Sequence, residues 1–156
     1  MTDLAIKIIR EDWADPAIAL PAYATQGAAG ADIRANFPPK ARAGGLTLAP
    51  MARVIVPTGL RVAIPTGYEM QIRPRSGLAL RYGLSLPNTP ATIDSDYRGP
   101  LGILLINLGD APAPIAHGDR IAQGIVMPVL QAQFVKTIVL DDTARGTGGF
   151  GSTGVE

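Results

Sequence analysis

The sequence predicts an all-β protein made of many short strands joined by turns. The chain of 156 residues contains 18 glycines and 14 prolines, which interrupt it too often for long helices. Apolar and polar residues alternate over residues 60–64 and 68–72, which is the period-2 pattern of half-buried strands. Because Pro65-Thr66-Gly67 lies between these two segments, we expect them to form a hairpin.

The composition indicates a single domain with an aliphatic core. Hydrophobic residues make up 47% of the chain and aromatic residues 5%, and a domain of this length buries roughly two-thirds of its unfolded surface. The net charge of +1 favours neither nucleic acid nor a membrane surface as a partner. The absence of cysteine excludes disulfides and thiolate metal sites and is typical of a reducing compartment. Since we find no secretory signal and no apolar stretch of membrane-spanning length, we expect a cytoplasmic protein.

The first third of the chain predicts strands separated by irregular segments. Residues 4–8 alternate as an opening strand, and residues 11–24 form an extended connection that two prolines interrupt. The small residues of 27–31 then lead to Asp32, which we read as a functional carboxylate, with a turn residue or a partner of Arg34 as the alternatives. Residues 37–45 read as a loop.

The second half of the chain predicts three more strands. Residues 101–106 are an apolar run of strand length, and residues 115–123 lead into a strand at 125–129. Residues 134–140 are expected to form the last strand. Alternation places four side chains on one face of the strand that includes residues 125–129, namely Ile121, Gln123, Ile125 and Met127.

One short helix is predicted between the strands. Ser76 is a good N-cap, residues 78–82 suit about one and a half turns, and Gly83 is a natural stop. Free backbone N–H groups at the start of this helix, beside Arg75 and the Ser76 hydroxyl, would form an anion site. The alternative is an ordinary capped helix with solvated arginines.

The segment 88–99, with the sequence NTPATIDSDYRG, is the central candidate for a functional site. It begins with turn residues and becomes β-like, and Asp94 and Asp96 would share one face of a strand. Like charges this close are costly unless water, a cation or a proton relieves them. The alternative is a solvated hairpin tip with a salt bridge from Arg98.

The single histidine and the glycine-rich tail complete the candidates. His117 lies in a Gly-Asp turn without a second histidine, so we read it as structural or solvated. The tail is either disordered or a lid that orders on its ligand, in which Arg145 pairs with phosphate and Phe150 stacks on a base.

Five segments together resemble the deoxyuridine triphosphatases (dUTPases, dUTP pyrophosphatases) of the all-β, homotrimeric kind. They occur in the order of that family and span nearly the whole chain: AAGAD at 28–32, PRSGLA at 74–79, NTPATIDSDYRG at 88–99, GDRIAQ at 118–123 and RGTGGFGSTG at 145–154. Each is a weak motif by itself, but five at compatible spacing are highly specific.

The resemblance implies a jelly-roll-like distorted β-barrel with one short helix. It also implies a homotrimer in which the C-terminal strand and tail are exchanged between subunits, so that each of three active sites is assembled from all three chains. Residues 1–144 would form the barrel and residues 145–156 the flexible lid. Ala91 departs from the family, which usually has glycine there, and would cost about 1 kcal/mol if that position required φ > 0.

The resemblance implies Mg²⁺-dependent hydrolysis of dUTP to dUMP and pyrophosphate, which keeps uracil out of DNA and supplies dUMP for thymidylate synthesis. Asp94 would be the general base for water attack on the α-phosphorus, and Asp32 would hold Mg²⁺ through its water shell. Asn88 and the backbone of 88–94 would read uracil, and Tyr97 would pack under deoxyribose. The substrate-binding residues implied are Arg75, Ser76, Gly77, Asn88, Thr92, Ile93, Tyr97, Gln123, Arg145, Phe150, Gly151, Ser152 and Thr153.

Two alternatives to this reaction stay open from the sequence. A dCTP deaminase-like member of the same superfamily would need a further acid/base residue near the pyrimidine, and Glu69 is the only internal glutamate after residue 11. A non-catalytic, nucleotide-binding regulatory trimer is the other, against which the intact Asp94 and the full tail argue.

Overall fold

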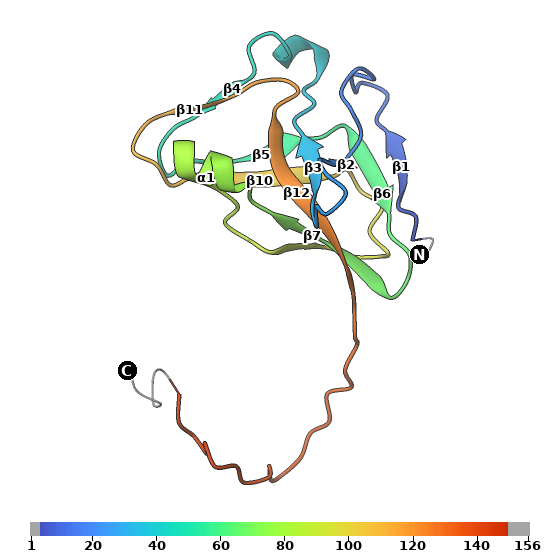
Figure 1. Cartoon of the computed structure of the whole chain (residues 1–156), viewed down its shortest axis with the longest axis vertical. Helices are drawn as coiled ribbons and strands as arrows, with labels where there is room; N and C mark the ends of the chain where they lie inside the picture. Colours follow the sequence, from blue (N-terminus) through green and yellow to red (C-terminus); the bar gives the residue numbers. More distant parts are fainter. Residues whose placement is uncertain (1–3, 150–156) are drawn as a thin grey trace.

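The structure is a computed structural model and describes residues 4–149 of the chain. These residues form twelve strands, a short 3-10 helix and one α-helix, so the predicted all-β class with one short helix is confirmed (Figure 1). The helices are η1 (Pro39–Ala41) and α1 (Ser76–Tyr82). The strands are β1 (Lys7–Arg10), β2 (Ala22–Tyr23), β3 (Ala31–Arg34), β4 (Leu46–Leu48), β5 (Arg53–Pro57), β6 (Leu60–Ala63), β7 (Tyr68–Arg73), β8 (Leu84–Ser85), β9 (Ala91–Ile93), β10 (Gly102–Asn107), β11 (Ala113–Ile115) and β12 (Arg120–Pro128).

The largest sheet has five strands in the order β2-β3-β12-β7-β9. The long strand β12 lies at its centre and pairs antiparallel with β3 on one side and with β7 on the other. Asp32 of β3 is opposite Gln123 of β12, which is in turn opposite Arg73 of β7. Because directly opposed residues point to the same side of a sheet, these three polar side chains share one face.

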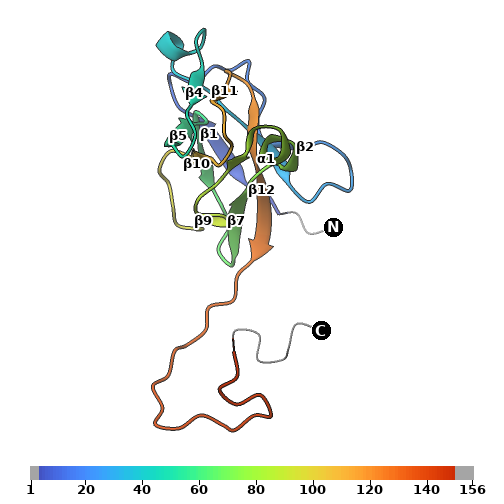
Figure 2. The ribbon, with the colours of Figure 1, turned by 90° about the vertical axis from the view of Figure 1, so that its left-hand side faces the viewer.

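Three smaller sheets, β1-β6, β5-β10-β8 and β4-β11, complete the body of the molecule. Figure 2 shows β4 and β11 at one end of this body and β7 and β9 near the end from which the chain leaves. All four sheets contribute to one apolar cluster, whose buried members include Ile33, Val62, Ile72, Ile103 and Ile115. Since these strands are distant in sequence, the alternating pattern of each is satisfied only by the complete fold.

The predicted hairpin of residues 60–72 is wrong, although both of its strands exist. β6 pairs with β1, whereas β7 pairs with β12 and β9, so the two segments belong to different sheets. A turn does occur between them, with Gly67 at φ 86°. Alternation fixes which face of a strand is buried, but it does not select the partner strand.

The face predicted for residues 121–127 is also wrong at its first position. The register between β3 and β12 shifts between Arg120 and Ala122, so an extra residue is inserted there. Ile121 and Ala122 are both buried, with exposed fractions of 1% and 0%, whereas Gln123 is half-buried. A bulge of this kind reverses the alternation, which period-2 counting cannot detect.

Residues 129–149 contain no strand, which contradicts the strand predicted at 134–140. The segment leaves the body after β12 and runs as a long arc away from it (Figures 1 and 2). Its large apolar side chains after Val129 are mostly exposed, including Phe134 at 97% and Ile138 at 101%. A strand needs a hydrogen-bonding partner. The Val129 N–H donates to Gly67 O at 2.9 Å, but the rest of the segment, as far as residue 149, makes no backbone hydrogen bond to the body.

Other boundaries differ by a few residues. The opening strand β1 begins at Lys7 rather than at residue 4, and β10 matches the apolar run at 101–106 closely. Between residues 4 and 149, no helix combines the length and the apolar character that a membrane span requires.

Candidate active site

An arginine–aspartate cluster connects three segments that are distant in sequence. The Arg75 Nε donates to Asp32 Oδ1 at 3.0 Å, and the Arg120 Nη1 donates to Asp32 Oδ2 at 3.0 Å. The Arg75 Nη1 also donates to the backbone oxygen of Arg120 at 3.1 Å. Asp32 is therefore neither a turn residue nor the partner of Arg34, which donates to Gly118 O at 2.7 Å instead.

The local fold brings Gln123 to the same place. Gln123 lies beside Asp32 across the β3–β12 ladder, and its Nε2 donates to Pro74 O at 3.0 Å, immediately before Arg75. A Cβ at residue 30 would overlap the Gln123 side-chain oxygen, so Gly30 makes room for the amide. The close approach explains why small residues precede Asp32 in the sequence.

The helix start contributes Ser76 and Gly77 to this region. The helix begins at Ser76 with Arg75 as its N-cap, so the predicted cap is one residue too late, and Arg75 makes no side-chain cap bond. Gly83 ends the helix at φ 68° in the left-handed conformation, as predicted. The first-turn amides of a helix lack intrahelical partners and carry partial positive charge, which adds to the charge of Arg75.

The cleft beside this cluster is strongly basic. It has a volume of about 350 Å³ and its lining includes one carboxylate, Asp119, and four arginines: Arg34, Arg75, Arg81 and Arg120. The Asp119 Oδ2 accepts the Ala116 N–H at 2.7 Å, so this carboxylate is partly satisfied within its own turn. An excess of cationic donors in a concave site suits an anionic ligand with several oxygens, such as a polyphosphate.

The metal expected at Asp32 can be tested against the side chains present. No cluster of three or more metal-ligating His, Cys, Asp or Glu side chains occurs within residues 4–149. Both Asp32 oxygens already accept a guanidinium, but each retains lone-pair capacity for a water. This donor set does not suit a cation bound directly by the protein. It fits Mg²⁺ that is carried on phosphates and reached through its water shell.

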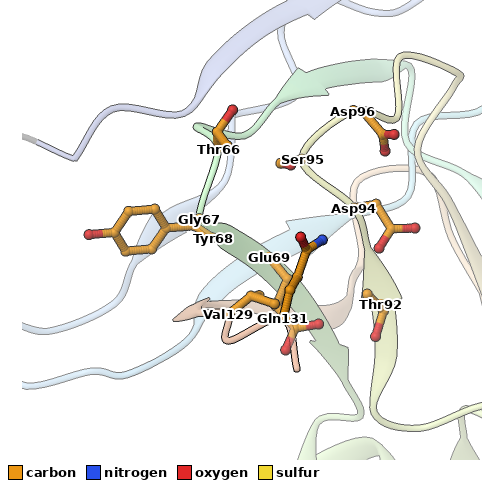
Figure 3. Close-up of a pocket in the computed structure, with 10 residues that line it drawn as sticks. All are labelled: Thr66, Gly67, Tyr68, Glu69, Thr92, Asp94, Ser95, Asp96, Val129 and Gln131. Atoms are coloured by element: carbon orange, nitrogen blue, oxygen red, sulfur yellow. The ribbon is translucent and has the colours of Figure 1, made fainter. Parts of the chain in front are cut away.

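A second region surrounds Asp94, which follows the end of β9. The turn is closed by a hydrogen bond from the Tyr97 N–H to Asp94 O at 3.2 Å. Asp94 borders a cavity of about 700 Å³ that is lined by Thr66, Gly67, Tyr68, Glu69, Thr92, Asp94, Ser95, Asp96, Val129 and Gln131. Figure 3 shows Thr92, Asp94 and Asp96 along one side of this cavity, with Glu69 on the neighbouring strand.

The expectation that Asp94 and Asp96 share one face of a strand is wrong, because β9 ends at Ile93 and both aspartates lie in the following turn. Arg98 does not form the salt bridge of the solvated-tip alternative. Its Nη1 donates to Ser95 O and Tyr97 O, both at 2.7 Å. Both carboxylates nonetheless line the same cavity.

The remaining residues of this segment surround the turn. Asn88 is exposed in the turn between β8 and β9, and Thr92 and Ile93 lie on β9, which pairs with β7. Tyr97 is 42% exposed, and its hydroxyl donates to Pro100 O at 3.0 Å. Ala91 is paired with Ile72 inside β9 and does not have positive φ, so the strain considered for this substitution is absent.

Only part of the tail candidates can be located. Arg145 is exposed, and its Nε donates to Gly148 O at 2.9 Å within a local turn. The other predicted tail residues lie outside the described residues, namely Phe150, Gly151, Ser152 and Thr153.

Within one chain the two regions are separate. Asp32 is on β3 and Asp94 follows β9, and two strands, β12 and β7, lie between them in the sheet. Three inter-strand spacings put these strands roughly 14 Å apart. Arg75, Ser76, Gly77 and Gln123 thus gather near Asp32, whereas Asn88, Thr92, Ile93 and Tyr97 gather near Asp94.

Sequence reasoning assigned no role to Arg120, although it lies in the segment 118–123. Its contact with Asp32 depends on the bulge in β12 and on the pairing of β3 with β12. The only signal in the sequence was its place three residues before Gln123.

The fold and the two regions define an all-β protein with an arginine-rich cleft near one side of its main sheet and a carboxylate-lined cavity near the other. The family model for dUTPase matches residues 17–154. The chain belongs to the dUTPase family.

Relatives and solved structures agree with this assignment. A deoxyuridine 5'-triphosphate nucleotidohydrolase of Dinoroseobacter shibae is 67% identical over 151 residues, which cover 97% of each chain. The structure of the Staphylococcus bacteriophage 80alpha dUTPase with dUPNHPP has a TM-score of 0.81 at 23% identity and covers 97% of this chain and 99% of that chain. A mutant dUTPase from phage phi11 of S. aureus, described with a structural Mg(II) ion, has a TM-score of 0.68 at 20% identity and covers 86% and 97%. The predicted jelly-roll-like β fold is confirmed.

Proposed function

We propose that this protein hydrolyses dUTP to dUMP and pyrophosphate. The observation that carries the proposal is the position of the family's segments in the fold. The segments at 28–32, 74–79 and 118–123 form one anion site, and the segment at 88–99 supplies a carboxylate beside a cavity. The 67% identity to a relative named for this reaction supports it over nearly the full chain.

Asp94 acts as the general base in this proposal. It accepts a proton from a water whose oxygen attacks the α-phosphorus, and the bond from that phosphorus to the bridging oxygen breaks as pyrophosphate leaves with the bonding electrons. Asp94 is exposed at the end of β9 and borders the cavity, so a water can reach it. Proton transfer by a positioned side chain contributes about 10²- to 10⁴-fold to such a rate.

Arg75, Ser76, Gly77 and Gln123 bind the phosphate chain. The Arg75 Nε and one Nη1 hydrogen are directed to Asp32 and to the Arg120 carbonyl, and its remaining donors are left for phosphate oxygens. The Ser76 and Gly77 amides add donors at the helix start. Asp32 would hold Mg²⁺ through water, and the bound ion would neutralise charge on the phosphates.

Asn88, Thr92 and Ile93 recognise uracil, mainly through backbone donors and acceptors of the β8–β9 connection. A cytosine would leave a buried polar group unpaired there, at a cost of about 1–3 kcal/mol. Tyr97 packs under deoxyribose, with its hydroxyl held by Pro100 O, and leaves no space for a 2′-hydroxyl.

Each active site is shared between subunits of a homotrimer. Asp94 and the arginine cluster are on separate strands of one chain's sheet, so a second copy is needed to bring them together. The exposed apolar side chains at 134–140 need a cover, and an apolar groove of about 340 Å³ beside Ile6 and Ile8 gives room for a strand from another copy. In this arrangement residues 1–144 form the folded unit. Residues 145–156 close over the substrate, with Arg145, Ser152 and Thr153 on phosphates and Phe150 on uracil beside Gly151.

The proposed substrate and metal can be tested in one experiment. Pyrophosphate release is measured from dUTP, dCTP, dTTP and UTP, with and without Mg²⁺, and we expect release from dUTP only and dependence on the ion. Ammonia release from dCTP would identify a deaminase instead, in which Glu69 of the Asp94 cavity would be the first residue to test. Tight dUTP binding without turnover would identify a regulatory trimer. A cytoplasmic protein would meet dUTP among the other nucleotides, which makes this discrimination the relevant property.

A further inference from the structure

We propose that Arg120 is a positioning residue that sets the orientation of the phosphate-binding Arg75, a role that rests on the proposed function. Arg120 provides one of the two acceptors that hold Arg75 and binds the other, which is Asp32. The Arg120 backbone oxygen accepts the Arg75 Nη1 at 3.1 Å, and the Arg120 Nη1 binds the Asp32 Oδ2 at 3.0 Å. The other Asp32 oxygen accepts the Arg75 Nε at 3.0 Å.

The bulge in β12 is what makes this contact available. Arg120 is opposite Arg34, and Ala122 is opposite Ile33, with Ile121 inserted between them. Without the insertion, Ile121 would point to the face of Asp32, and Arg120 would point to the core. The bulge buries Ile121 at 1% exposure and returns Arg120 to the face of Asp32 and Gln123.

Arg120 also determines the net charge that the cluster of Asp32, Arg75 and Arg120 presents to a ligand. A single aspartate shared between two guanidiniums leaves a net positive charge at the site. Without the Arg120 side chain, Asp32 would pair with Arg75 alone, and a bidentate pair would turn donors of Arg75 away from phosphate. Arg34 cannot replace it, because Arg34 already donates to Gly118 O.

We expect Arg120→Ala to impair hydrolysis of dUTP and binding of its phosphate chain, but not binding of the nucleoside part. We expect kcat/KM for dUTP to fall by about 10- to 100-fold, the scale of a small misplacement of a substrate-orienting group. Calorimetry should show weaker binding of non-hydrolysable α,β-imido-dUTP and of pyrophosphate, with dUMP affinity nearly unchanged. Arg120→Lys should recover part of the loss, because an ammonium still reaches Asp32 as a point charge.

Arg53→Ala is the matched control for the loss of one positive charge. Arg53 is exposed on β5 and does not line the basic cleft. We expect its effect to stay below about threefold, as for an ordinary surface substitution. An equal loss in both variants would mean that Arg120 contributes only general positive charge, and would overturn the proposal.

A double-mutant cycle with Asp32→Asn decides whether Arg120 acts through Asp32. We expect Arg120→Ala to have little further effect in the Asp32→Asn background, so the two losses are strongly non-additive. Additive losses would refute the positioning role. If the wild-type protein does not hydrolyse dUTP, the proposed function fails first, but the same cycle measured by pyrophosphate binding still tests the coupling.

Discussion

At the scale of the residue, the properties of the candidate site depend on the contacts that neighbouring residues make with ordinary side chains. Asp32 would be an unremarkable strand carboxylate without Arg75 and Arg120, and Gln123 could not occupy its position if residue 30 had a Cβ. Asp94 is the opposite case, because the role proposed for it depends on an open position after β9 rather than on a partner.

The residue-scale prediction concerns Asp94. Asp94→Asn keeps the shape of the side chain but removes its basicity, so we expect kcat to fall by about 10²- to 10⁴-fold while dUTP still binds. Single-turnover hydrolysis and calorimetric binding measure the two effects separately. Asp96→Asn removes the same charge from the same cavity and should reduce kcat much less. Wild-type turnover in Asp94→Asn would remove Asp94 as the base.

At the scale of the element, a polar clasp fixes the loop after β1 against the loop before β12. The Phe37 N–H donates to His117 Nδ1 at 3.0 Å, which leaves the Nε2 hydrogen directed at Asp15 Oδ2, 3.2 Å away. The Arg42 Nη1 lies 3.5 Å from the same Asp15 oxygen. The structural reading of His117 therefore agrees with its contacts.

The clasp predicts a pH dependence of stability. The Ala17 backbone N–H and the His117 side chain lower the pKa of Asp15 from its ordinary value of 3.8. A lowered folded-state pKa stabilises the fold above the ordinary value, and this contribution is lost as pH falls through the lower folded value. Asp15→Asn should thus reduce Tm at pH 7, and its difference from wild type should shrink below about pH 4. A constant difference from pH 7 to pH 2 would contradict this.

Elements were predicted well from sequence where local chemistry decides them. Gly83 ends α1 because only a left-handed residue closes the helix there, and β10 follows directly from its apolar run. Partner strands were not predictable, as β6 and β7 demonstrate, because two strands with the same alternation fit several neighbours. The bulge beside Arg120 was hidden for a similar reason, since one inserted residue leaves no mark in composition or period.

At the scale of the whole molecule, we propose that the site is completed only in an assembly of several copies. The sequence grouped the five family segments by resemblance, but the fold places four of them in two regions, one near Asp32 and one near Asp94. In the proposed homotrimer, convergence of these segments on one ligand is a property of the assembly, which no pattern within a single chain encodes. The exposed apolar side chains at 134–140 also favour an assembly, because such a surface is rarely left uncovered.

Two truncations separate the roles of the tail. Deleting residues 145–156 removes the proposed lid only, so we expect an intact trimer with sharply reduced kcat/KM. Deleting residues 130–156 also removes the apolar segment that contains Phe134 and Ile138, and should abolish the trimer. Light scattering gives the mass and pyrophosphate release gives the activity. Normal kinetics in the shorter deletion would contradict the proposed role of residues 145–156 as a lid.

Mixing two inactive variants tests the shared site directly. Asp94→Asn lacks the base and Arg75→Ala lacks the phosphate ligand, so each should be nearly inactive alone. If one site takes Asp94 from one chain and Arg75 from the next, every mixed trimer contains one site with both native residues. Unfolding and refolding the two variants together should therefore restore about one-third of the sites in each mixed trimer, whereas refolding them separately should restore none. If both residues acted within one chain, mixing would recover nothing, and sharing of the site between subunits would be excluded.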